Sequence, residues 1–355
     1  MAMKVGILGT GNIAPAYIKG CGEFPDDIRI VACADLIDEK ARAFAEAVGI
    51  EPLSIQGLLN NHEIDLVINL TVPTAHAEVS RQIIDAGKHV YVEKPLALRR
   101  EEGRALLEAA AGRGVRVGCA PDTFLGAGGQ TARMVIDRGD IGEPVAAVSF
   151  MGYHGPESFH PNPAFFYQYG GGPMFDMGPY YLTTLVNLVG PFESISAMAK
   201  RSFETRTAQH ESIRGQEVPV GVDTHIAGTA LFANGVVASI ITSFDLWSHH
   251  LPRIEIYGSK GSMLVPNPNI FGGDVQVWSL DQPEWQVVGP VGRSDLERGV
   301  GVADMARAIA NQEPHRASGE LAYHVLDVMQ AFEESAESGE LVRLSSHAER
   351  PPALA

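Results

Sequence analysis

KVGILGTGNIA, residues 4–14, combines a short apolar strand with a glycine-rich turn that follows it at once. Gly9 permits a tight turn out of the strand, and Gly11 lets the backbone approach a ligand closely. Ala14 is small enough for the following helix to pack against the strand. The N-terminus of that helix offers N–H groups and a partial positive charge to phosphates. The stretch therefore predicts the first half of a dinucleotide-binding βαβ unit.

An acidic residue stands at the matching distance from this turn. A second apolar run, residues 28–34, ends in Asp35, about 20 residues beyond Ala14, where a carboxylate meets the adenosine ribose. A carboxylate accepts hydrogen bonds from a ribose 2′-OH but repels a 2′-phosphate, and no cation directly follows Asp35. We expect NAD, with NADP disfavoured. The alternative to a dinucleotide-binding unit is that the glycine-rich stretch is an ordinary strand-to-helix turn. The predicted cofactor-binding residues here are Gly9, Thr10, Gly11, Asn12, Ile13 and Asp35.

Composition limits the class of protein. The chain has 355 residues, enough for two domains, with 20% charged and 45% hydrophobic residues, the balance of a globular protein. A net charge of −16 disfavours nucleic acid and anionic membranes as partners. Three cysteines form no paired motif, and the first strand begins too early to leave room for a signal peptide. We expect a cytoplasmic protein with a small-molecule partner.

The first third of the sequence alternates strand and helix patterns. Its strands are predicted at residues 4–8, 28–34, 65–70, 89–92 and 115–119, and its helices at 38–48, 55–60, 76–86 and 101–112. Such alternation predicts a doubly wound parallel sheet. We assign residues 1–123 to an NAD-binding Rossmann domain.

The pattern changes beyond this point, and we assign residues 124–355 to a substrate-binding and oligomerisation domain of the α+β class. Strands are predicted at residues 144–151, 194–199, 225–232, 236–244, 253–257 and 275–280, and helices at 130–138, 302–311 and 320–337. Residues 152–173 form a long loop rich in glycine, proline and aromatic residues. Asn234 and Gly235 predict a type I′ hairpin between two alternating strands. So many strands in succession predict an open, mostly antiparallel sheet.

A second motif, GKHVYVEKP, spans residues 87–95. Glu93 and Lys94 fall at the C-terminal end of a predicted parallel strand, where open α/β sheets bind ligands. A lysine there can donate to a substrate hydroxyl and favour negative charge on the reacting oxygen. Pro95 restricts Lys94 to extended geometry. By residue type alone, an ordinary surface lysine before a proline is the commoner interpretation of Lys94.

The sequence resembles the Gfo/Idh/MocA oxidoreductases, which include inositol dehydrogenase and glucose–fructose oxidoreductase, over nearly the whole chain. The resemblance rests on GTGNI (residues 9–13), AGKHVYVEKP (86–95) and GGGPMFDMGPY (170–180). It implies a Rossmann domain followed by an α/β domain whose open sheet mediates assembly, as a homodimer or homotetramer. It also implies hydride transfer between a nicotinamide cofactor and a sugar or cyclitol carbon, with a functional Lys94.

The third motif carries the proton chemistry in this family. Relatives place an aspartate and, four residues later, a histidine on one helix; here the positions hold Asp176 and Tyr180. Some relatives use tyrosine, so Tyr180 is the expected acid/base, with its pKa of about 10 lowered by a neighbour such as Lys94. The alternatives are a helix N-cap for Asp176, with Pro179 in the first turn, and a core position for Tyr180.

The resemblance also assigns further positions. Cofactor contacts are expected from Thr71, Pro73, His76, Glu93 and Lys94; His76 could instead be only the first residue of a helix. Substrate contacts are expected from Lys94, Asp122, His160, Asn162, Asp176 and Tyr180; a capping role is an open alternative for Asp122. The histidine spacings match no metal-binding pattern, so we expect no metal site.

These features together predict an NAD-dependent dehydrogenase or reductase that acts on a secondary alcohol or ketone carbon of a sugar, glycoside or cyclitol. Two alternatives remain. The first is an enzyme that retains NAD and returns the hydride, as an epimerase or a glycoside-cleaving enzyme would. The second is a regulator that senses NAD or a sugar and has lost the chemistry.

Overall fold

The computed structural model describes residues 2–354, which form two compact units. The first unit contains the chain up to Gly126 together with Asp295–Leu326; the second contains Ala127–Ser294 and the residues from Asp327 onward. The first division lies close to the boundary predicted after residue 123. The return of Asp295–Leu326 to the first unit was not predicted, because no local sequence pattern marks which unit a segment joins.

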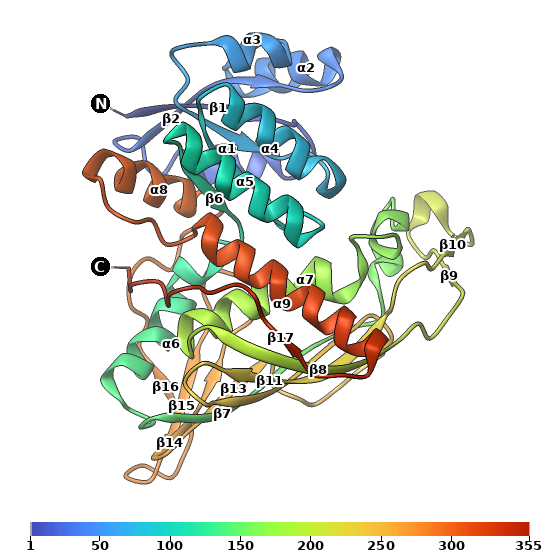
Figure 1. Cartoon of the computed structure of the whole chain (residues 1–355), viewed down its shortest axis with the longest axis vertical. Coiled ribbons are helices and arrows are strands. Elements are labelled where there is room, and N and C mark those ends of the chain that lie inside the picture. Colours follow the sequence, from blue (N-terminus) through green and yellow to red (C-terminus); the bar gives the residue numbers. More distant parts are fainter. Residues whose placement is uncertain (1, 355) are drawn as a thin grey trace. The chain divides into compact units, whose positions relative to one another are not determined.

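The first unit is built on a six-stranded parallel sheet (Figure 1), which confirms the predicted Rossmann architecture. The strand order is β3-β2-β1-β4-β5-β6, the order of dinucleotide-binding folds. The strands are β1 (Met3–Leu8), β2 (Ile28–Ala34), β3 (Glu51–Pro52), β4 (Leu66–Asn69), β5 (His89–Val92) and β6 (Val117–Cys119). The helices are α1 (Ala14–Cys21), α2 (Asp38–Val48), α3 (Ile55–Asn60), α4 (His76–Asp85), α5 (Arg100–Arg113) and α8 (Val300–Asn311).

Helices cover both faces of this parallel sheet. One apolar core joins strand residues such as Val67 and Val90 to Leu58 of α3, Ile83 of α4 and Leu106 of α5. Helices α1 and α8 pack against each other and against β2, and α8 is the orange helix beside the blue strands in Figure 1. Burial on both faces explains why these strands are continuous apolar runs and could be predicted closely.

The second unit contains a nine-stranded, mostly antiparallel sheet, as predicted, in the order β16-β15-β14-β13-β7-β12-β11-β8-β17. Only β7 and β12 pair in parallel. The strands are β7 (Pro144–Gly152), β8 (Phe192–Lys200), β11 (His225–Phe232), β12 (Val237–Ser243), β13 (Ile254–Gly258), β14 (Gly261–Val265), β15 (Val275–Ser279), β16 (Gln286–Val288) and β17 (Val342–Arg343). A separate two-stranded sheet pairs β9 (Thr205–Thr207) with β10 (Glu217–Pro219).

Helices α6 (Ala127–Arg138) and α7 (Gly172–Leu188) belong to the second unit. Helix α9 (Gly319–Ser338) contributes its last twelve residues, from Asp327 onward, to the second unit and its earlier residues to the first. Helix α7 packs on β7, β11 and β12, and Phe332 of α9 packs over Gly228 of β11. Within the part of the chain that the structure describes, no helix is both long and apolar enough to cross a membrane.

The hairpin between β11 and β12 is present, but its predicted type I′ turn is wrong. Type I′ needs positive φ at both central residues, and within this turn only Gly235 has one, of 86°. Gly235 N–H donates to Phe232 O at 2.8 Å and Phe232 N–H donates to Val236 O at 2.9 Å, as in a type I turn followed by a glycine bulge. The Asn234 side-chain amide donates to Val189 O at 2.9 Å, which ties this residue to the end of α7.

Candidate active site

The glycine-rich turn leaves the C-terminal end of β1. Gly9 has a φ of 100°, and a Cβ there would lie 2.7 Å from the Leu70 carbonyl, so only glycine fits. A Cβ on Gly11 would meet nothing within 4 Å, so this side of the turn is open. Ala14 is fully buried at the start of α1, and no side chain caps that helix. The turn and the uncapped helix end therefore fit the pyrophosphate of a dinucleotide.

Asp35, just beyond β2, lies against this turn. Its Oδ2 accepts hydrogen bonds from the Thr10 backbone N–H at 2.8 Å and the Thr10 hydroxyl at 2.9 Å, and its Oδ1 accepts from Ile37 N–H at 3.0 Å. Partial burial raises the pKa of Asp35, but these hydrogen bonds and the charge of Lys40 outweigh it, so the pKa lies below its ordinary value. The carboxylate is therefore anionic, and three hydrogen bonds fix its orientation beside the glycine-rich turn.

His76 holds the segment after Lys94 in place. The side chain is 1% exposed; its Nδ1 lies 2.7 Å from Pro95 O and its Nε2 lies 3.0 Å from Thr71 O. Burial lowers the pKa of His76, and the two carbonyl partners oppose that shift without reversing it. Thr71 is fixed in turn by Asn69, whose Oδ1 accepts from the Thr71 hydroxyl at 2.7 Å. His76 therefore joins the end of β4 to the turn after β5. Pro73 begins the short 3₁₀ helix Pro73–Ala75, which directly precedes His76 in the sequence.

Glu93 points into the first unit. Its Oε1 accepts from the Tyr17 hydroxyl at 2.9 Å and lies 3.7 Å from Nη1 of Arg298, and its Oε2 accepts from Lys94 N–H at 3.0 Å. Arg298 belongs to the segment that returns to this unit, and its carbonyl approaches α1 so closely that only glycine fits at Gly20. Lys94 itself is half-buried at the C-terminal end of β5. Glu93 is thus held by Tyr17 and Arg298, and Glu93 in turn fixes the backbone of Lys94.

The geometry of Asp122 is that of a residue that caps a helix, the alternative to a substrate contact. Its side chain is fully buried, and its Oδ2 accepts from Gly299 N–H at 3.0 Å and Gly301 N–H at 2.9 Å, where α8 begins. Burial raises the pKa of Asp122, although these two bonds and the charge of Arg298 oppose the shift. A carboxylate at the first turn of a helix is favourable because it meets the free N–H groups there.

Asp176 and Tyr180 both lie in α7, four residues apart, so they share one face of the helix. The helix begins at Gly172 with Gly171 as its N-cap, so the alternative of Asp176 as the N-cap is wrong. Pro179 lies in the helix interior rather than in the first turn, and its missing N–H leaves a gap in the helical hydrogen bonds. Asp176 is half-buried and Tyr180 is 3% exposed.

The loop that leads into α7, residues 153–171, carries the other predicted substrate residues and one that was missed. We call it the β7–α7 loop. His160 accepts from Asn162 N–H at 3.0 Å and lies edge-on to Phe165, while Asn162 is exposed. Tyr153, the first loop residue, was not predicted. Burial raises the pKa of Tyr153, and the negative charges of Asp176 and Glu157 add to the shift.

The structure thus groups the predicted residues within each unit. In the first unit the grouped residues are Gly9, Thr10, Gly11, Asn12, Ile13, Asp35, Thr71, Pro73, His76, Glu93 and Lys94, all at or just beyond the C-terminal ends of parallel strands. In the second unit they are Asp176 and Tyr180 on α7 and His160 and Asn162 in the preceding loop. Among residues 2–354, no three His, Cys, Asp or Glu side chains gather as a metal site would require.

Comparisons with known proteins match both parts of the chain to one family. The family described as "Oxidoreductase family, NAD-binding Rossmann fold" matches residues 3–120, and "GFO/IDH/MocA C-terminal domain" matches residues 130–264. The 1,5-anhydro-D-fructose reductase of Ensifer adhaerens is 26% identical over 74% of this chain and 75% of its own. The inositol 2-dehydrogenase of Rhizobium meliloti (strain 1021) is 27% identical over 75% and 76%.

Solved structures share the fold along almost the whole chain. A levoglucosan dehydrogenase in complex with NADH and levoglucosan has a TM-score of 0.84 at 22% identity, over 98% of this chain and 100% of its own. The two matched domains, in this order and with the NAD-binding turn and Asp35 in place, identify the chain as a member of the Gfo/Idh/MocA oxidoreductase family with an NAD-binding Rossmann domain.

Proposed function

We propose that this protein transfers a hydride between NAD and a secondary alcohol or ketone carbon of a sugar, glycoside or cyclitol. The observation that carries the proposal is the placement of Lys94 at the C-terminal end of β5, with its backbone held by Glu93 and its neighbour Pro95 held by His76. The names of the relatives, a sugar-derivative reductase and an inositol dehydrogenase, support this substrate class.

The residues that would hold NAD belong to the first unit. The turn of residues 9–13 would hold the pyrophosphate, Asp35 would accept from the adenosine ribose, and the segment from Thr71 to Pro73 would lie on the nicotinamide side. His76 and Glu93 act on the cofactor side through the backbone that they hold. NAD⁺, when bound, supplies the hydride acceptor.

The proton and the reacting oxygen are handled by three side chains. Lys94 donates to the substrate oxygen and stabilises its negative charge. Tyr180 takes the hydroxyl proton, and Asp176 orients Tyr180 or a neighbouring hydroxyl. We further propose that His160 and Asn162 contact the substrate, and that Tyr153, which begins the same loop directly after β7, belongs to the same set. Asp122 is proposed as a capping residue in place of a substrate contact.

The test is NADH absorbance with NAD⁺ and a panel of monosaccharides, glycosides and cyclitols. We expect NADH to form with at least one member, and the reverse reaction to consume NADH. Turnover without net NADH, together with tightly retained cofactor, indicates instead an epimerase or a glycoside-cleaving enzyme. Binding of NAD and sugar with neither net NADH formation nor conversion of the sugar indicates a non-catalytic regulator that senses them.

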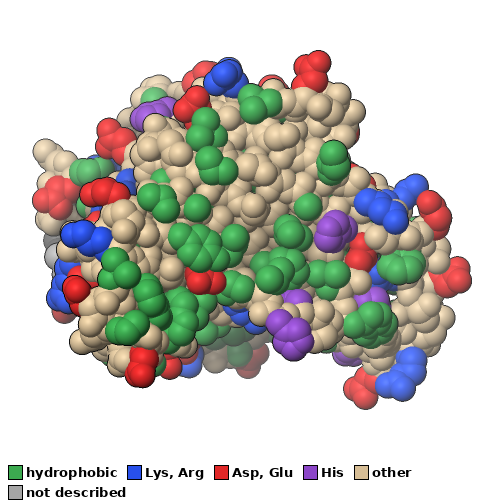
Figure 2. Space-filling view, turned by 90° about the horizontal axis from the view of Figure 1, so that it is seen from below, with side chains coloured by type: hydrophobic (Ala, Val, Ile, Leu, Met, Phe, Trp, Pro, Cys, Tyr) green, Lys and Arg blue, Asp and Glu red, His purple; other side chains and the backbone are tan. Residues whose placement is uncertain are grey.

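We propose that the outer face of the nine-stranded sheet mediates a homodimer or homotetramer. Strand register places Met198, Leu231, Val237, Ile241 and Val148 on the face opposite the helices. Met198 is 81% exposed, and Figure 2, seen from the side where the sheet lies, shows hydrophobic side chains across this face with charged ones mostly near its edges. An apolar face of this kind is stabilised when a second copy covers it.

Light scattering tests this assembly. The native protein is expected to be dimeric or tetrameric at micromolar concentration, and the pair Met198→Glu and Val237→Glu is expected to release monomers, because buried carboxylates are costly. Leu36→Glu, at an exposed residue of the first unit, is the matched control and should leave the assembly intact. A native protein that is strictly monomeric contradicts the proposal.

The proposed location is the cytoplasm, with no nucleic acid as partner. All three cysteines, Cys21, Cys33 and Cys119, are free and buried, as is usual in a reducing compartment. The net charge of −16 disfavours a polyanionic partner. Localisation of a tagged full-length chain to any other compartment contradicts this proposal.

A further inference from the structure

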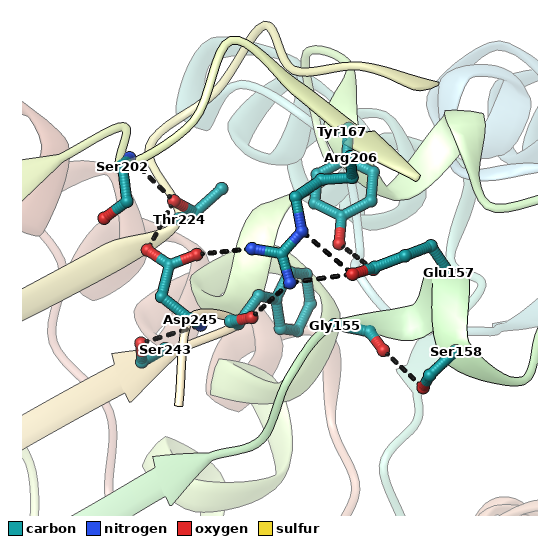
Figure 3. Close-up of polar contacts among 10 residues, drawn as sticks. Gly155, Glu157, Ser158, Tyr167, Ser202, Arg206, Thr224, Ser243 and Asp245 are labelled. Carbon is teal, nitrogen blue, oxygen red and sulfur yellow. Dashed lines mark hydrogen bonds and ion pairs between the residues drawn. The ribbon is translucent and has the colours of Figure 1, made fainter. Parts of the chain in front are cut away.

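The second unit contains a buried ionic cluster centred on Arg206 of β9. Its Nε donates to Glu157 Oε1 at 2.8 Å, its Nη1 to Asp245 Oδ1 at 3.0 Å and its Nη2 to the Phe244 carbonyl at 3.1 Å. The side chains of Arg206, Glu157 and Asp245 are 4%, 2% and 9% exposed. Figure 3 shows the guanidinium lying between the two carboxylates, which come from opposite sides. One guanidinium therefore joins three separate segments of the chain.

The two carboxylates are also held by other residues. The Tyr167 hydroxyl donates to Glu157 Oε2, and the Thr224 hydroxyl donates to Asp245 Oδ2 at 2.7 Å. The Glu157 carbonyl accepts from Gln209 N–H at 2.9 Å. Two carboxylates and one guanidinium leave the cluster one negative charge in excess. Removing the guanidinium would leave two buried carboxylates with no counter-charge, which a protein tolerates poorly.

This cluster is connected to the predicted substrate residues through the β7–α7 loop. Glu157 and Tyr167 both lie in that loop, and Tyr167 O accepts from Gly221 N–H at 2.8 Å. At the end of the loop, a Cβ on Gly171 would lie 2.6 Å from the Phe166 carbonyl oxygen, so the loop backbone packs tightly against the start of α7. Asp176 follows in the next turn of that helix.

The Asp245 side of the cluster is connected to the beginning of the same loop. Asp245 lies two residues beyond the end of β12, and the next residue, Leu246, donates its N–H to Tyr153 O at 3.4 Å. Tyr153 N–H donates to Ser243 O at 3.1 Å. Both arms of the Arg206 cluster therefore hold the β7–α7 loop: Glu157 belongs to it, and the segment that contains Asp245 is bonded to Tyr153 at its start.

We propose that Arg206 is a positioning residue for the reaction: by binding Glu157 and Asp245 together, it fixes the β7–α7 loop so that Tyr153 and the first turns of α7 hold the substrate in the reactive geometry. This rests on the proposed function. The guanidinium suits the task because its planar set of donors reaches two carboxylates and a carbonyl at once, which the single ammonium of a lysine cannot do.

The first experiment compares Arg206→Lys with Arg201→Lys. Arg201 is the matched control because its ion pair with Glu204, at 3.1 Å, is exposed and lies in the segment just before β9. Arg206→Lys keeps the charge, so we expect it to fold and bind NAD⁺ as the native protein does. The substrate KM is expected to rise and kcat to fall, so that kcat/KM drops by about 10²-fold, because the reacting groups are misplaced. Arg201→Lys is expected to remain within about twofold of the native value.

The second experiment measures hydrogen exchange and does not depend on turnover. Arg206→Lys is expected to speed exchange in residues 154–168 and leave β11 and β12 unchanged, because those two strands are held by sheet pairing that does not involve Arg206. Tyr167→Phe removes one hydroxyl from the same cluster and should change exchange and substrate KM in the same direction but by less, which keeps the test valid if Arg206→Lys does not fold.

The outcomes separate the two proposals. If the native protein turns over no sugar or cyclitol, the proposed function fails, and hydrogen exchange alone decides whether Arg206 fixes the loop. If the native protein is active, unchanged loop exchange in both variants overturns the role of Arg206, as does faster exchange with a native substrate KM. Equal losses of NAD⁺ and substrate affinity overturn it too, because they indicate general destabilisation.

Discussion

Thr10 and Asp35 are bound to each other by two hydrogen bonds: the backbone N–H and the hydroxyl of Thr10 both donate to one carboxylate oxygen of Asp35, at 2.8 and 2.9 Å. The contact fixes the carboxylate at the end of β2 beside the glycine-rich turn. It also keeps the pKa of Asp35 below its ordinary value despite partial burial. A fixed anion at this position repels a 2′-phosphate, so the relationship explains a preference for NAD.

Replacing Asp35 should therefore change cofactor choice. In the double variant Asp35→Ser and Leu36→Arg, the repelling carboxylate is lost and an arginine is placed at an 88% exposed position. We expect kcat/KM to move toward NADP by at least about tenfold, since a charge-assisted hydrogen bond to phosphate is strong. Asp38→Asn, at an exposed residue three positions on, is the control and should keep NAD preference. A native enzyme that prefers NADP would contradict the assignment.

Lys94 is expected to act in the chemical step. Lys94→Met keeps the length of the side chain but removes the ammonium, so NAD⁺ binding should survive while kcat falls by about 10²-fold or more. Lys4→Met is the control, because Lys4 pairs with exposed Glu63 at the surface of the first unit. Steady-state kinetics and NAD⁺ titration by fluorescence separate the two effects. Near-native kcat in Lys94→Met rules out the proposed role.

Tyr180 is expected to carry the substrate proton. Tyr180→Phe removes only the hydroxyl, so folding and NAD⁺ affinity should persist while kcat falls by about 10²-fold. The matched control is Tyr181→Phe, one residue later in α7, whose buried hydroxyl accepts from Arg253 at 3.4 Å. The alkaline limb of kcat/KM should change in Tyr180→Phe alone. Full activity there, with an inactive His160→Phe, would assign the proton to His160 instead.

Glu333 of α9 should make stability depend on pH. Burial, with the charges of Glu337, Asp223 and Glu334, raises the pKa of Glu333 to about 7. The folded state therefore keeps a proton that the unfolded chain loses near its ordinary pKa, so stability falls as pH rises from about 4.5 to about 7. Glu333→Gln cannot ionise and should be more stable than the native protein by up to about 3 kcal/mol above pH 7.

Urea unfolding at about pH 5 and about pH 8 measures this difference. The advantage of Glu333→Gln should be small at the lower pH and large at the higher one. Glu108→Gln, on the exposed surface of α5, is the control and should show no such change. An advantage that is equal at both pH values would show that Glu333 is not the titrating group.

The sequence predicted best those features that are set by local patterns. The strands of the first sheet are continuous apolar runs because helices cover both faces, so β2 and β5 were predicted with their observed bounds. The short strands β9, β10, β14 and β16 were missed, since runs of three to five residues carry little periodic signal. The turn type at Asn234 was wrong because a tertiary contact to Val189 acts on the turn.

Features formed by distant segments could not be predicted in the same way. Arg206 meets Glu157 and Asp245 from positions 49 and 39 residues away, and no motif marks such a cluster. The buried position of Asp122 depends on Gly299 and Gly301, more than 170 residues later in the chain. Within the candidate site, the motifs located Asp35, Lys94 and Asp176, whereas Tyr153 has no sequence signature.

Deuterium labelling of the transferred hydrogen tests the proposed hydride transfer to NAD⁺. A substrate found in the panel is labelled with deuterium at the carbon that bears the reacting hydroxyl, incubated with the protein and NAD⁺, and the nicotinamide product is examined by mass spectrometry and NMR. We predict one deuterium per NADH formed, with the transfer greatly slowed in Lys94→Met and in Tyr180→Phe. Deuterium that is lost to solvent or recovered in a rearranged sugar, without labelled NADH, would contradict it.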